Sequence, residues 1–381
     1  MKTLILKFLT NCITPLEEEK LCKWLKETKN KNTFKTYVHD IYALNMHYSN
    51  SIDDIDADIL FNNILSNIQK PNNPIKPVTP LWIKYAVAAS ITILISLAFI
   101  FNNDNSQVVE PIIVNNTIKT GTDKATLTLE SGEEVALTKG TSIQTPHANS
   151  NGEAIIYKNT SSQQLVYNYL TVPRGGQFQL TLSDGTQVWL NSESQLKYPV
   201  SFTDGNSRQV ELVYGEAYFD VSPSTEHQGS NFKVYHKAQE IQVLGTEFNV
   251  KAYKDETHVY TTLAEGKVSV STENENNVLE PNEQSNLNTT NKNLTVSKVN
   301  VYSETSWKDG IFSFIDKPLK DVTKVLERWY DVDVIFMNQS LGIVEFNGVL
   351  GKDQSIEEIL GAIKSISINN YEINNKTIII K

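Results

Sequence analysis

The sequence contains one long apolar run, with no charged residue from Tyr85 to Phe101. As a helix these residues would extend about 26 Å at ~1.5 Å per residue, close to the ~30 Å thickness of a bilayer core. Trp82 precedes the run, where an aromatic ring suits the membrane interface. A buried core helix is the alternative, but no amphipathic stripe is visible in the run. The pattern predicts a single transmembrane helix over residues 81–103.

Residues 1–80, before the run, show helical periodicity. Thr14-Pro15-Leu16-Glu17 combines an N-cap, a proline at the first helical position and a glutamate three residues after the cap, which indicates the start of a helix. The apolar residues that follow near one helical face include Leu21, Trp24 and Leu25. Two further amphipathic stretches come before residue 70. Three short helices have apolar surface to spare, so we predict a small all-α domain with a partner; a self-sufficient bundle is the alternative.

From residue 120 to residue 300 apolar and polar residues alternate, and turn signals such as Asp184-Gly185 recur. The stretch Leu127–Leu137 matches Leu180–Leu190 position for position in its apolar and turn residues. A strand–turn–strand unit used twice is typical of stacked β layers, so we predict a β-rich domain that is sandwich-like or solenoid-like. Residues 104–119 are polar and irregular and are expected to form a tether.

After Trp307 the apolar spacing predicts a compact α+β domain over residues 306–381, with the order βαββαβ. Its last strand is Thr377-Ile378-Ile379-Ile380. We expect this strand at a sheet edge, where it could pair with a strand of another protein; an internal strand is the alternative. The predicted fold class is therefore a multi-domain membrane protein with all-α, transmembrane, β-rich and α+β parts.

The distribution of charge predicts the orientation. The chain has 381 residues and a formal net charge of −10. Residues 1–84 carry 11 basic and 9 acidic side chains, whereas the remainder carries 23 and 35. Lysines precede the apolar run while Asp104 and Glu110 follow it, so the positive-inside rule places the N-terminus in the cytoplasm and the larger part outside. The acidic outer part argues against direct binding of nucleic acid.

The sequence has no motif for catalysis on a substrate, so we expect no enzyme, no cofactor and no metal site. It lacks a Gly-rich phosphate loop, paired histidines at metal spacing and a nucleophile elbow. Cys12 and Cys22 match no metal or redox spacing. Asp184, Glu216 and Asp220 could be imagined as glycosidase carboxylates, but their positions in a turn and beside a strand favour a solvated, structural role.

Arginine is rare in this chain. The only arginines are Arg174, Arg208 and Arg328, among 34 basic residues. Where lysine is the usual cation, an arginine indicates a site that needs the planar guanidinium fork. Chance placement is the alternative.

Several motifs of the β-rich region occur together in a characteristic order. They are Val172-Pro173-Arg174-Gly175-Gly176, Leu182–Asn191, Tyr198-Pro199, Gly215–Val221 and Val243–Val250. In order and spacing they resemble FecR-type transmembrane anti-sigma factors, in the form common in Bacteroidetes-like bacteria. The resemblance extends to Glu19–Leu25 and to the C-terminal domain, which is similar to the small signalling domain at the N-termini of secretins and TonB-dependent receptors.

The resemblance implies a signalling role at the cell inner membrane, which the chain would cross once with its C-terminus in the periplasm. Residues 1–80 would hold an extracytoplasmic-function sigma factor, with Leu21, Trp24 and Leu25 in the core or facing the sigma factor. The periplasmic part would sense the signalling domain of a TonB-dependent outer-membrane transporter loaded with an iron chelate or glycan, and residues 377–380 are the expected contact. The resemblance leaves the sign of regulation open.

The resemblance also points to one bond in the chain. In several FecR-type proteins a Gly-Thr bond at the position matching Gly245-Thr246 cleaves itself. The Thr246 hydroxyl would attack the Gly245 carbonyl and form an ester that water hydrolyses. His236 and His258 are the nearest titratable candidates along the sequence for activating the hydroxyl. The alternative is a β-bulge at Gly245 with Thr246 as an ordinary strand residue.

A rival class is a membrane-tethered periplasmic protein that binds a glycan or an envelope component and has no sigma partner. It would explain the β-rich region but would leave the helical residues 1–80 without a role. A search for a sigma factor bound to residues 1–80 discriminates between the two classes.

Overall fold

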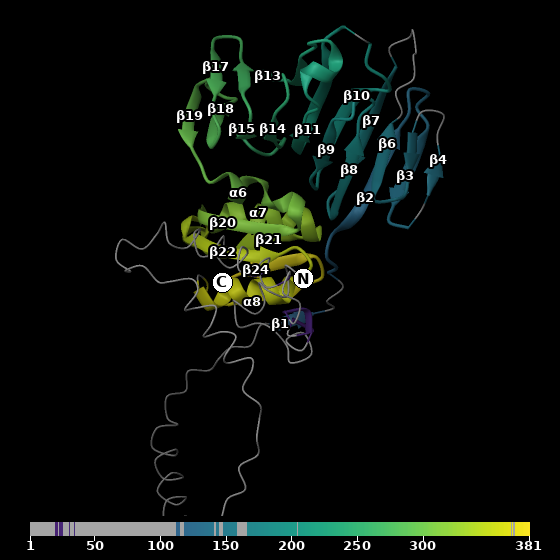
Figure 1. Cartoon of the computed structure of the whole chain (residues 1–381). Coiled ribbons are helices and arrows are strands. Elements are labelled where there is room, and N and C mark those ends of the chain that lie inside the picture. Colours follow the sequence, from purple (N-terminus) through teal and green to yellow (C-terminus); the bar gives the residue numbers. More distant parts are fainter. Residues whose placement is uncertain are drawn as a thin grey trace, which may run out of the picture. The chain divides into compact units, whose positions relative to one another are not determined.

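The structure of the chain is a computed structural model, shown in Figure 1. It describes residues 20, 21, 23–25, 30, 34, 112–114, 118–140, 142–144, 148–157, 166–203, 205–366, 368 and 370–381. The chain divides into two compact units, residues 1–109 and 110–381. Each is described by itself.

The described structure is mostly β, and this contradicts the predicted fold class of a multi-domain membrane protein with an all-α domain and a transmembrane helix. None of the helices among the described residues is long and apolar enough to cross a membrane. Helix α7 (Leu319–Tyr330) has 12 residues and a polar face. The apolar residues of the described chain lie instead mainly on the buried faces of strands. The predicted span, residues 81–103, and most of residues 1–80 lie outside the described residues.

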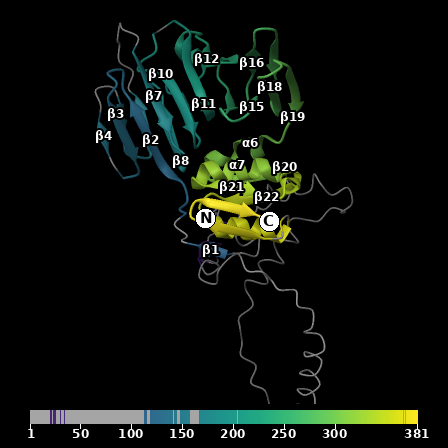
Figure 2. The ribbon, with the colours of Figure 1, turned by 180° about the vertical axis from the view of Figure 1, so that it is seen from behind.

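Strands β2 to β19 form one continuous 18-stranded arrangement, which we call the β part (Figures 1 and 2). In strands such as β7 every second side chain is buried, because successive side chains point to opposite faces. One layer contains β2 (Thr122–Thr128), β3 (Glu134–Thr138), β7 (Tyr167–Val172), β10 (Ser194–Pro199), β12 (Phe232–His236), β13 (Gln239–Val243), β16 (Val268–Ser271) and β17 (Asn276–Leu279). The other contains β4 (Ile143–Gln144), β5 (Ala148–Ser150), β6 (Ala154–Tyr157), β8 (Gly176–Thr181), β9 (Gln187–Leu190), β14 (Glu247–Ala252), β15 (His258–Glu265), β18 (Glu283–Asn288) and β19 (Leu294–Lys298).

The long strand β11 (Arg208–Asp220) joins the two layers. Its first half pairs with β10 and β12, and from Gly215 onward it pairs with β9 and β14. Gly215 has a φ of +99°, and a Cβ at this position would lie only 2.4 Å from Ser194 Cα. Only glycine tolerates both conditions, so Gly215 allows the strand to pass from one layer to the other. The β part encloses one core, which includes Leu212, Phe219 and Phe248.

The C-terminal module follows the β part in the same unit and has its own core. Its elements are α6 (Val301–Thr305), η2 (Ser306–Asp309), β20 (Ile311–Pro318), α7, β21 (Asp333–Phe336), η3 (Gln339–Ile343), β22 (Glu345–Gly351), α8 (Ile356–Ile366), β23 (Tyr371–Asn374) and β24 (Thr377–Ile380). From β20 onward the module has one strand more than the predicted βαββαβ order. The strands divide between a β20–β22 pair and a four-stranded sheet in the order β1-β23-β24-β21, in which β1 (Ile112–Val114) comes from the start of the unit.

Strand β24 is not the sheet edge that we expected. It pairs with β23 on one side and with β21 on the other. Ile378 and Ile380 are completely buried in the module core. The last strand in the sequence need not be the last strand in a sheet, because strand order in space is set by packing rather than by position in the chain.

Candidate functional site

The candidate functional site is the interface at which loops of the β part contact the C-terminal module. We call this interface the seam. Arg174, between β7 and β8, reaches the C-terminal end of α7. Its Nη2 donates to the Glu327 carbonyl at 3.0 Å and also to the Val332 carbonyl, and its Nη1 lies 3.2 Å from the Asp333 carboxylate. The last carbonyls of a helix lack helical partners and favour a nearby cation. Arg174 therefore caps α7 from the β part.

Arg328, on α7, makes the reciprocal contact with the β part. Its guanidinium group lies 3.6 Å from the centre of the Tyr253 ring. Its nitrogen atoms lie 2.6 Å from Asp255, 3.0 Å from Glu256 and 3.4 Å from Glu193. The side chain is only 6% exposed. A planar guanidinium group can stack on a ring and bind several carboxylates at once, which lysine cannot do.

Lys352, after β22, is buried at the seam. Its Nζ donates to Gln177 Oε1 of the β part at 2.7 Å and lies 3.8 Å from the centre of the Trp329 ring. The Trp329 indole in turn donates to the Lys352 carbonyl at 2.8 Å. A Cβ on Gly121 would lie 2.5 Å from the Trp329 ring, so only glycine leaves room for the indole here.

The amine of Lys352 has no carboxylate within ion-pair distance among the described residues. Burial lowers the pKa of Lys352 to about 7, and the charges of Glu216 and Asp123 offset this only in part. The seam thus contains an amine whose charge changes near neutral pH.

Glu216, on β11, is a buried carboxylate held by neutral donors. Its oxygens accept from Asn191 Nδ2 at 2.8 Å, from Asn249 Nδ2 at 2.9 Å and from the Tyr253 hydroxyl at 3.4 Å. Burial raises the pKa of Glu216, although Lys251 and the two amides oppose the shift. The expectation that Glu216 is solvated was wrong, because the side chain points into the seam and not to the surface.

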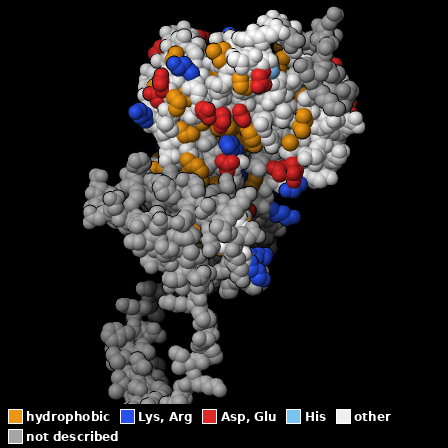
Figure 3. All heavy atoms as spheres, in the orientation of Figure 1, with side chains coloured by type: hydrophobic (Ala, Val, Ile, Leu, Met, Phe, Trp, Pro, Cys, Tyr) orange, Lys and Arg blue, Asp and Glu red, His pale blue; other side chains and the backbone are white. Residues whose placement is uncertain are grey.

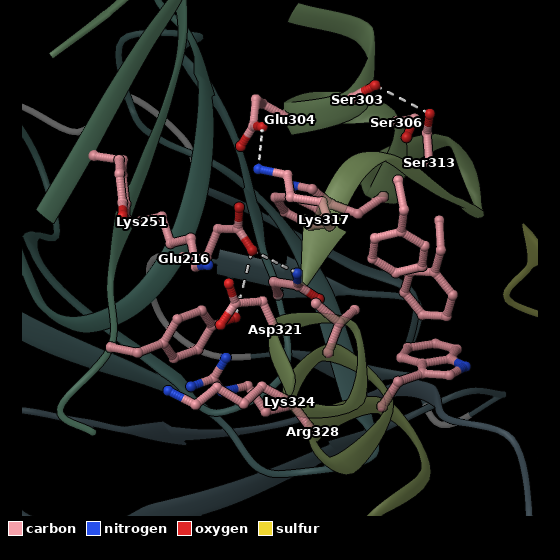
Figure 4. Close-up of a pocket in the computed structure, with 18 of the residues that line it drawn as sticks. Glu216, Lys251, Ser303, Glu304, Ser306, Ser313, Lys317, Asp321, Lys324 and Arg328 are labelled. Carbon is pink, nitrogen blue, oxygen red and sulfur yellow. Dashed lines mark hydrogen bonds and ion pairs between the residues drawn. The ribbon is translucent and has the colours of Figure 1, made fainter. Parts of the chain in front are cut away.

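A cavity of about 180 Å³ lies beside Glu216, between the β part and the module (Figure 4). Figure 4 shows the module residues Lys317, Asp321, Lys324 and Arg328 across from Glu216 and Lys251 of the β part. The lining also includes the aromatic side chains Phe312, Phe314 and Trp329, beside serine hydroxyls and side-chain amides. The cavity therefore combines charged, polar and aromatic groups.

The third arginine, Arg208, belongs to the β part alone. It forms a buried ion pair with Asp184 at 2.8 Å, with both side chains 2% exposed. It also donates to the carbonyls of Ser222 and Ser230. Asp184 therefore has the structural role that we expected, but it is buried and not solvated. All three arginines make several directed contacts, as their scarcity predicted.

The structure places Gly245 and Thr246 between β13 and β14. Gly245 has a φ of +154°, a conformation that side chains rarely adopt. Thr246 is buried, and its hydroxyl donates to the Lys267 carbonyl at 3.0 Å. A Cβ on Gly266 would lie 3.0 Å from the Gly245 carbonyl oxygen and 2.9 Å from Thr246 Oγ1, so the bond lies in a tightly packed turn.

Histidines His236 and His258 make their contacts elsewhere. His236 Nδ1 accepts from the Ala238 backbone, and His258 contacts Thr257 and Asn288. The helix η1 (Ser224–His227) is the element that contacts this turn. The amide of Ser224, its first residue, donates to the Leu244 carbonyl. His227 Nε2 in η1 lies 2.8 Å from the Ser222 hydroxyl.

The other predicted site residues lie apart from the seam or in the other unit. Leu21 and Leu25 are buried and Trp24 is half-buried. Over the part of the chain that the structure describes, no His, Cys, Asp and Glu residues are grouped so as to hold a metal ion. On the face shown in Figure 3 the basic side chains lie among acidic ones and do not form a continuous basic surface.

Sequence reasoning identified the arginines but missed Lys352, Tyr253 and Asp255. A lysine in a lysine-rich chain gives no signal of burial, and Tyr253 and Asp255 lie in a loop without a motif. Only the packing of α7 against that loop shows their role.

The profile of the FecR protein family matches residues 168–269, and the profile of the FecR C-terminal region matches residues 311–380. Two crystal structures of a candidate anti-sigma factor from Parabacteroides distasonis, at 1.65 Å and 2.50 Å resolution, are each 31% identical to this chain. Their TM-scores are 0.51 and 0.50, and the similarity covers 56% of this chain and 98% of each of those chains. No curated protein matches the chain.

The two matching regions lie in the β part and in the C-terminal module, which meet at the seam. Fold and similarity together define a β-rich regulatory protein with an α+β C-terminal module. The chain belongs to the FecR family of anti-sigma factors. The family indicates a regulatory role rather than an enzymatic one.

Proposed function

We propose that the chain controls an extracytoplasmic-function sigma factor and relays to it a signal from the cell envelope. The family membership carries this proposal. Residues 1–80 hold the sigma factor, and residues 120–300 and 306–381 receive the signal. The seam supports the proposal, because a module held by a few directed charged contacts is a joint that a partner can tighten or release.

The protein works at the cell inner membrane, with its N-terminus in the cytoplasm and the unit 110–381 in the periplasm. Proteins of this family are generally associated with membranes. The excess of basic residues over residues 1–84 and of acidic residues after residue 84 supports this orientation.

The periplasmic partner is the signalling domain of a TonB-dependent outer-membrane transporter, which binds the C-terminal module. Because both sides of β24 are paired, residues 377–380 offer no open edge to this partner and support the binding only by holding the sheet of the module together. Deletion of residues 306–381 is expected to abolish this binding, and calorimetry with the isolated signalling domain measures it.

The central experiment is co-purification of the full-length chain with the sigma factor encoded beside its gene. Trp24→Ala is the test variant, because a half-buried tryptophan between buried Leu21 and Leu25 can contact a partner without being the core. Loss of an interface tryptophan costs roughly 2–4 kcal/mol, so the sigma factor should be lost. Lys20→Ala, at an exposed position of the same helix, is the control and should retain it. Retention of the sigma factor by Trp24→Ala, with unchanged sigma-dependent transcription, rejects the assignment of Trp24.

The same experiment distinguishes an anti-sigma factor from the rival class, a glycan- or envelope-binding protein. A protein that only binds a glycan or an envelope component would co-purify with no sigma factor in its wild-type form.

A further inference from the structure

The cavity at the seam is not used by the proposed relay. Its wall contains four carboxylates and four cationic groups, so its formal charge is balanced. These groups are Glu216, Glu256, Glu304 and Asp321, and Lys251, Lys317, Lys324 and Arg328. A balanced wall has no net field to attract an anion or a cation. It suits a neutral molecule that can use both kinds of group.

Asp321 is the charged group of this wall that lacks a partner. Lys251 pairs with Glu256 at 3.1 Å, and Lys317 pairs with Glu304 at 2.9 Å. The Asp321 carboxylate, in contrast, has no ion pair or hydrogen bond to any described residue. It lies three and seven residues before Lys324 and Arg328, so all three project from one face of α7 (Figure 4). A half-buried carboxylate without a partner is ready to accept hydrogen bonds from a bound molecule.

Aromatic side chains form another part of the cavity lining. The Phe312 ring lies 6.2 Å from the Phe314 ring and 6.4 Å from the Trp329 ring, measured between centres. Next to them the hydroxyls of Ser303 and Ser313 lie 3.1 Å apart. Aromatic faces pack against apolar C–H surfaces, while hydroxyl groups serve as both donors and acceptors.

We propose that the cavity binds a neutral sugar ring, either a free monosaccharide or the terminal residue of a glycan. Each sugar hydroxyl can donate to a carboxylate such as Asp321 and accept from a cation such as Lys324, while the C–H face of the ring packs on the aromatic wall. A cavity of about 180 Å³ leaves room for one sugar ring.

A sugar bound in the cavity would also hold the seam closed. The wall is formed by residues of both the β part and the C-terminal module, so a bound sugar contacts both. A ligand that binds only the closed seam stabilises it by mass action. This inference goes beyond the proposed relay, since it gives the unit 110–381 a ligand of its own, whether or not a transporter binds.

The test uses the full-length chain in a detergent without sugar groups. Titration calorimetry and thermal unfolding are measured with glucose, galactose, mannose and N-acetylglucosamine, and with choline chloride and sodium sulfate as cationic and anionic probes. We expect at least one sugar to bind and to raise the melting temperature, and neither charged probe to do so. Absence of binding by all four sugars, or binding of a charged probe alone, overturns the proposal.

Three variants locate the site. Asp321→Asn removes the unpaired charge without breaking an ion pair, and Val325→Phe fills the cavity from the same helix. Asp321→Asn should weaken sugar binding about tenfold or more, because a hydrogen bond to a charged group is replaced by one to a neutral amide. Val325→Phe should weaken it by a similar factor, because the ring occupies the space of the sugar. Asp353→Asn, at an exposed position outside the cavity, should bind as the wild type does. Unchanged affinity in both Asp321→Asn and Val325→Phe would show that the sugar binds elsewhere and overturns the assignment.

Discussion

Lys352 is the residue that links the seam to pH. Its pKa is about 7 in the folded chain, against the usual 10.5 of an unfolded lysine. Between these values the unfolded chain binds more protons than the folded chain, so stability rises with pH across this window and is insensitive to Lys352 below it. The gap between these two pKa values corresponds to roughly 5 kcal/mol at ~1.4 kcal/mol per pKa unit.

Lys352→Met keeps the length of the side chain and removes the amine. We expect urea unfolding of the wild type to show a gain in stability from about pH 7 to about pH 10 that the variant lacks. Lys376→Met, which removes an exposed lysine of the same module, is the control for general effects of charge. Equal pH profiles for the wild type and Lys352→Met would mean that the amine is solvated.

Thr246 can be tested for self-cleavage at the residue scale. Only the hydroxyl is needed for attack on the Gly245 carbonyl, so Thr246→Ser should still cleave while Thr246→Ala should remain intact. The alanine variant loses one buried hydrogen bond to the Lys267 carbonyl, a cost of about 1 kcal/mol, and should still fold. Mass spectrometry of the purified chain detects the two fragments. If the wild type stays intact as well, the packed turn around Gly245 is purely structural.

At the residue scale, the sequence predicted a special role correctly where a residue type is rare in the chain. Three arginines in a lysine-rich chain indicated directed contacts, and the structure shows such contacts for each. It failed for carboxylates, because Asp184 and Glu216 look like surface residues in the sequence and become buried only through strands far away in the chain.

Among the elements, the repeated hairpins were the clearest sequence signal. Leu127–Leu137 contains the turn between β2 and β3, and Leu180–Leu190 contains the turn between β8 and β9. Both turns use the same backbone bonds: Gly132 donates to the Leu129 carbonyl and Gly185 to the Leu182 carbonyl, with φ near +85° at each glycine. Such turns are local and can therefore be read from the sequence. The place of β24 inside its sheet depends on β21, about forty residues away, and could not be read in this way.

The internal position of β24 gives a prediction about stability. Ile378 is completely buried, whereas Ile335 on the outer strand β21 is 53% exposed. Ile378→Ala should destabilise the chain by roughly 3 kcal/mol and Ile335→Ala by less than about 1 kcal/mol. Chemical denaturation of the two variants compares the same substitution at both positions. Similar losses for the two would contradict the strand order β23-β24-β21.

At the scale of the whole unit, the β part and the C-terminal module have separate cores, and the polar seam lies between them. Because the two cores are separate clusters, we expect the seam to open while both remain folded. The amide of Gly175, in the β part, donates to the carbonyl of Arg328, in the module, at 2.7 Å. Hydrogen exchange at Gly175 therefore reports opening of the seam.

Arg328→Met is expected to open the seam, because it removes the one cation that three carboxylates share. Lys251 still pairs with Glu256 and Lys324 with Asp255 in the variant. Since Asp255 and Glu193 are about half exposed, the cost should be roughly 1–3 kcal/mol, less than for a fully buried pair, and exchange at Gly175 should accelerate about tenfold to a hundredfold. The variant keeps the Arg328 backbone carbonyl, so faster exchange reflects motion and not a lost acceptor. Exchange at Val250, in the core of the β part, should not change. Equal acceleration at Gly175 and Val250 would instead mean that the unit unfolds as one body and that the seam is no independent joint.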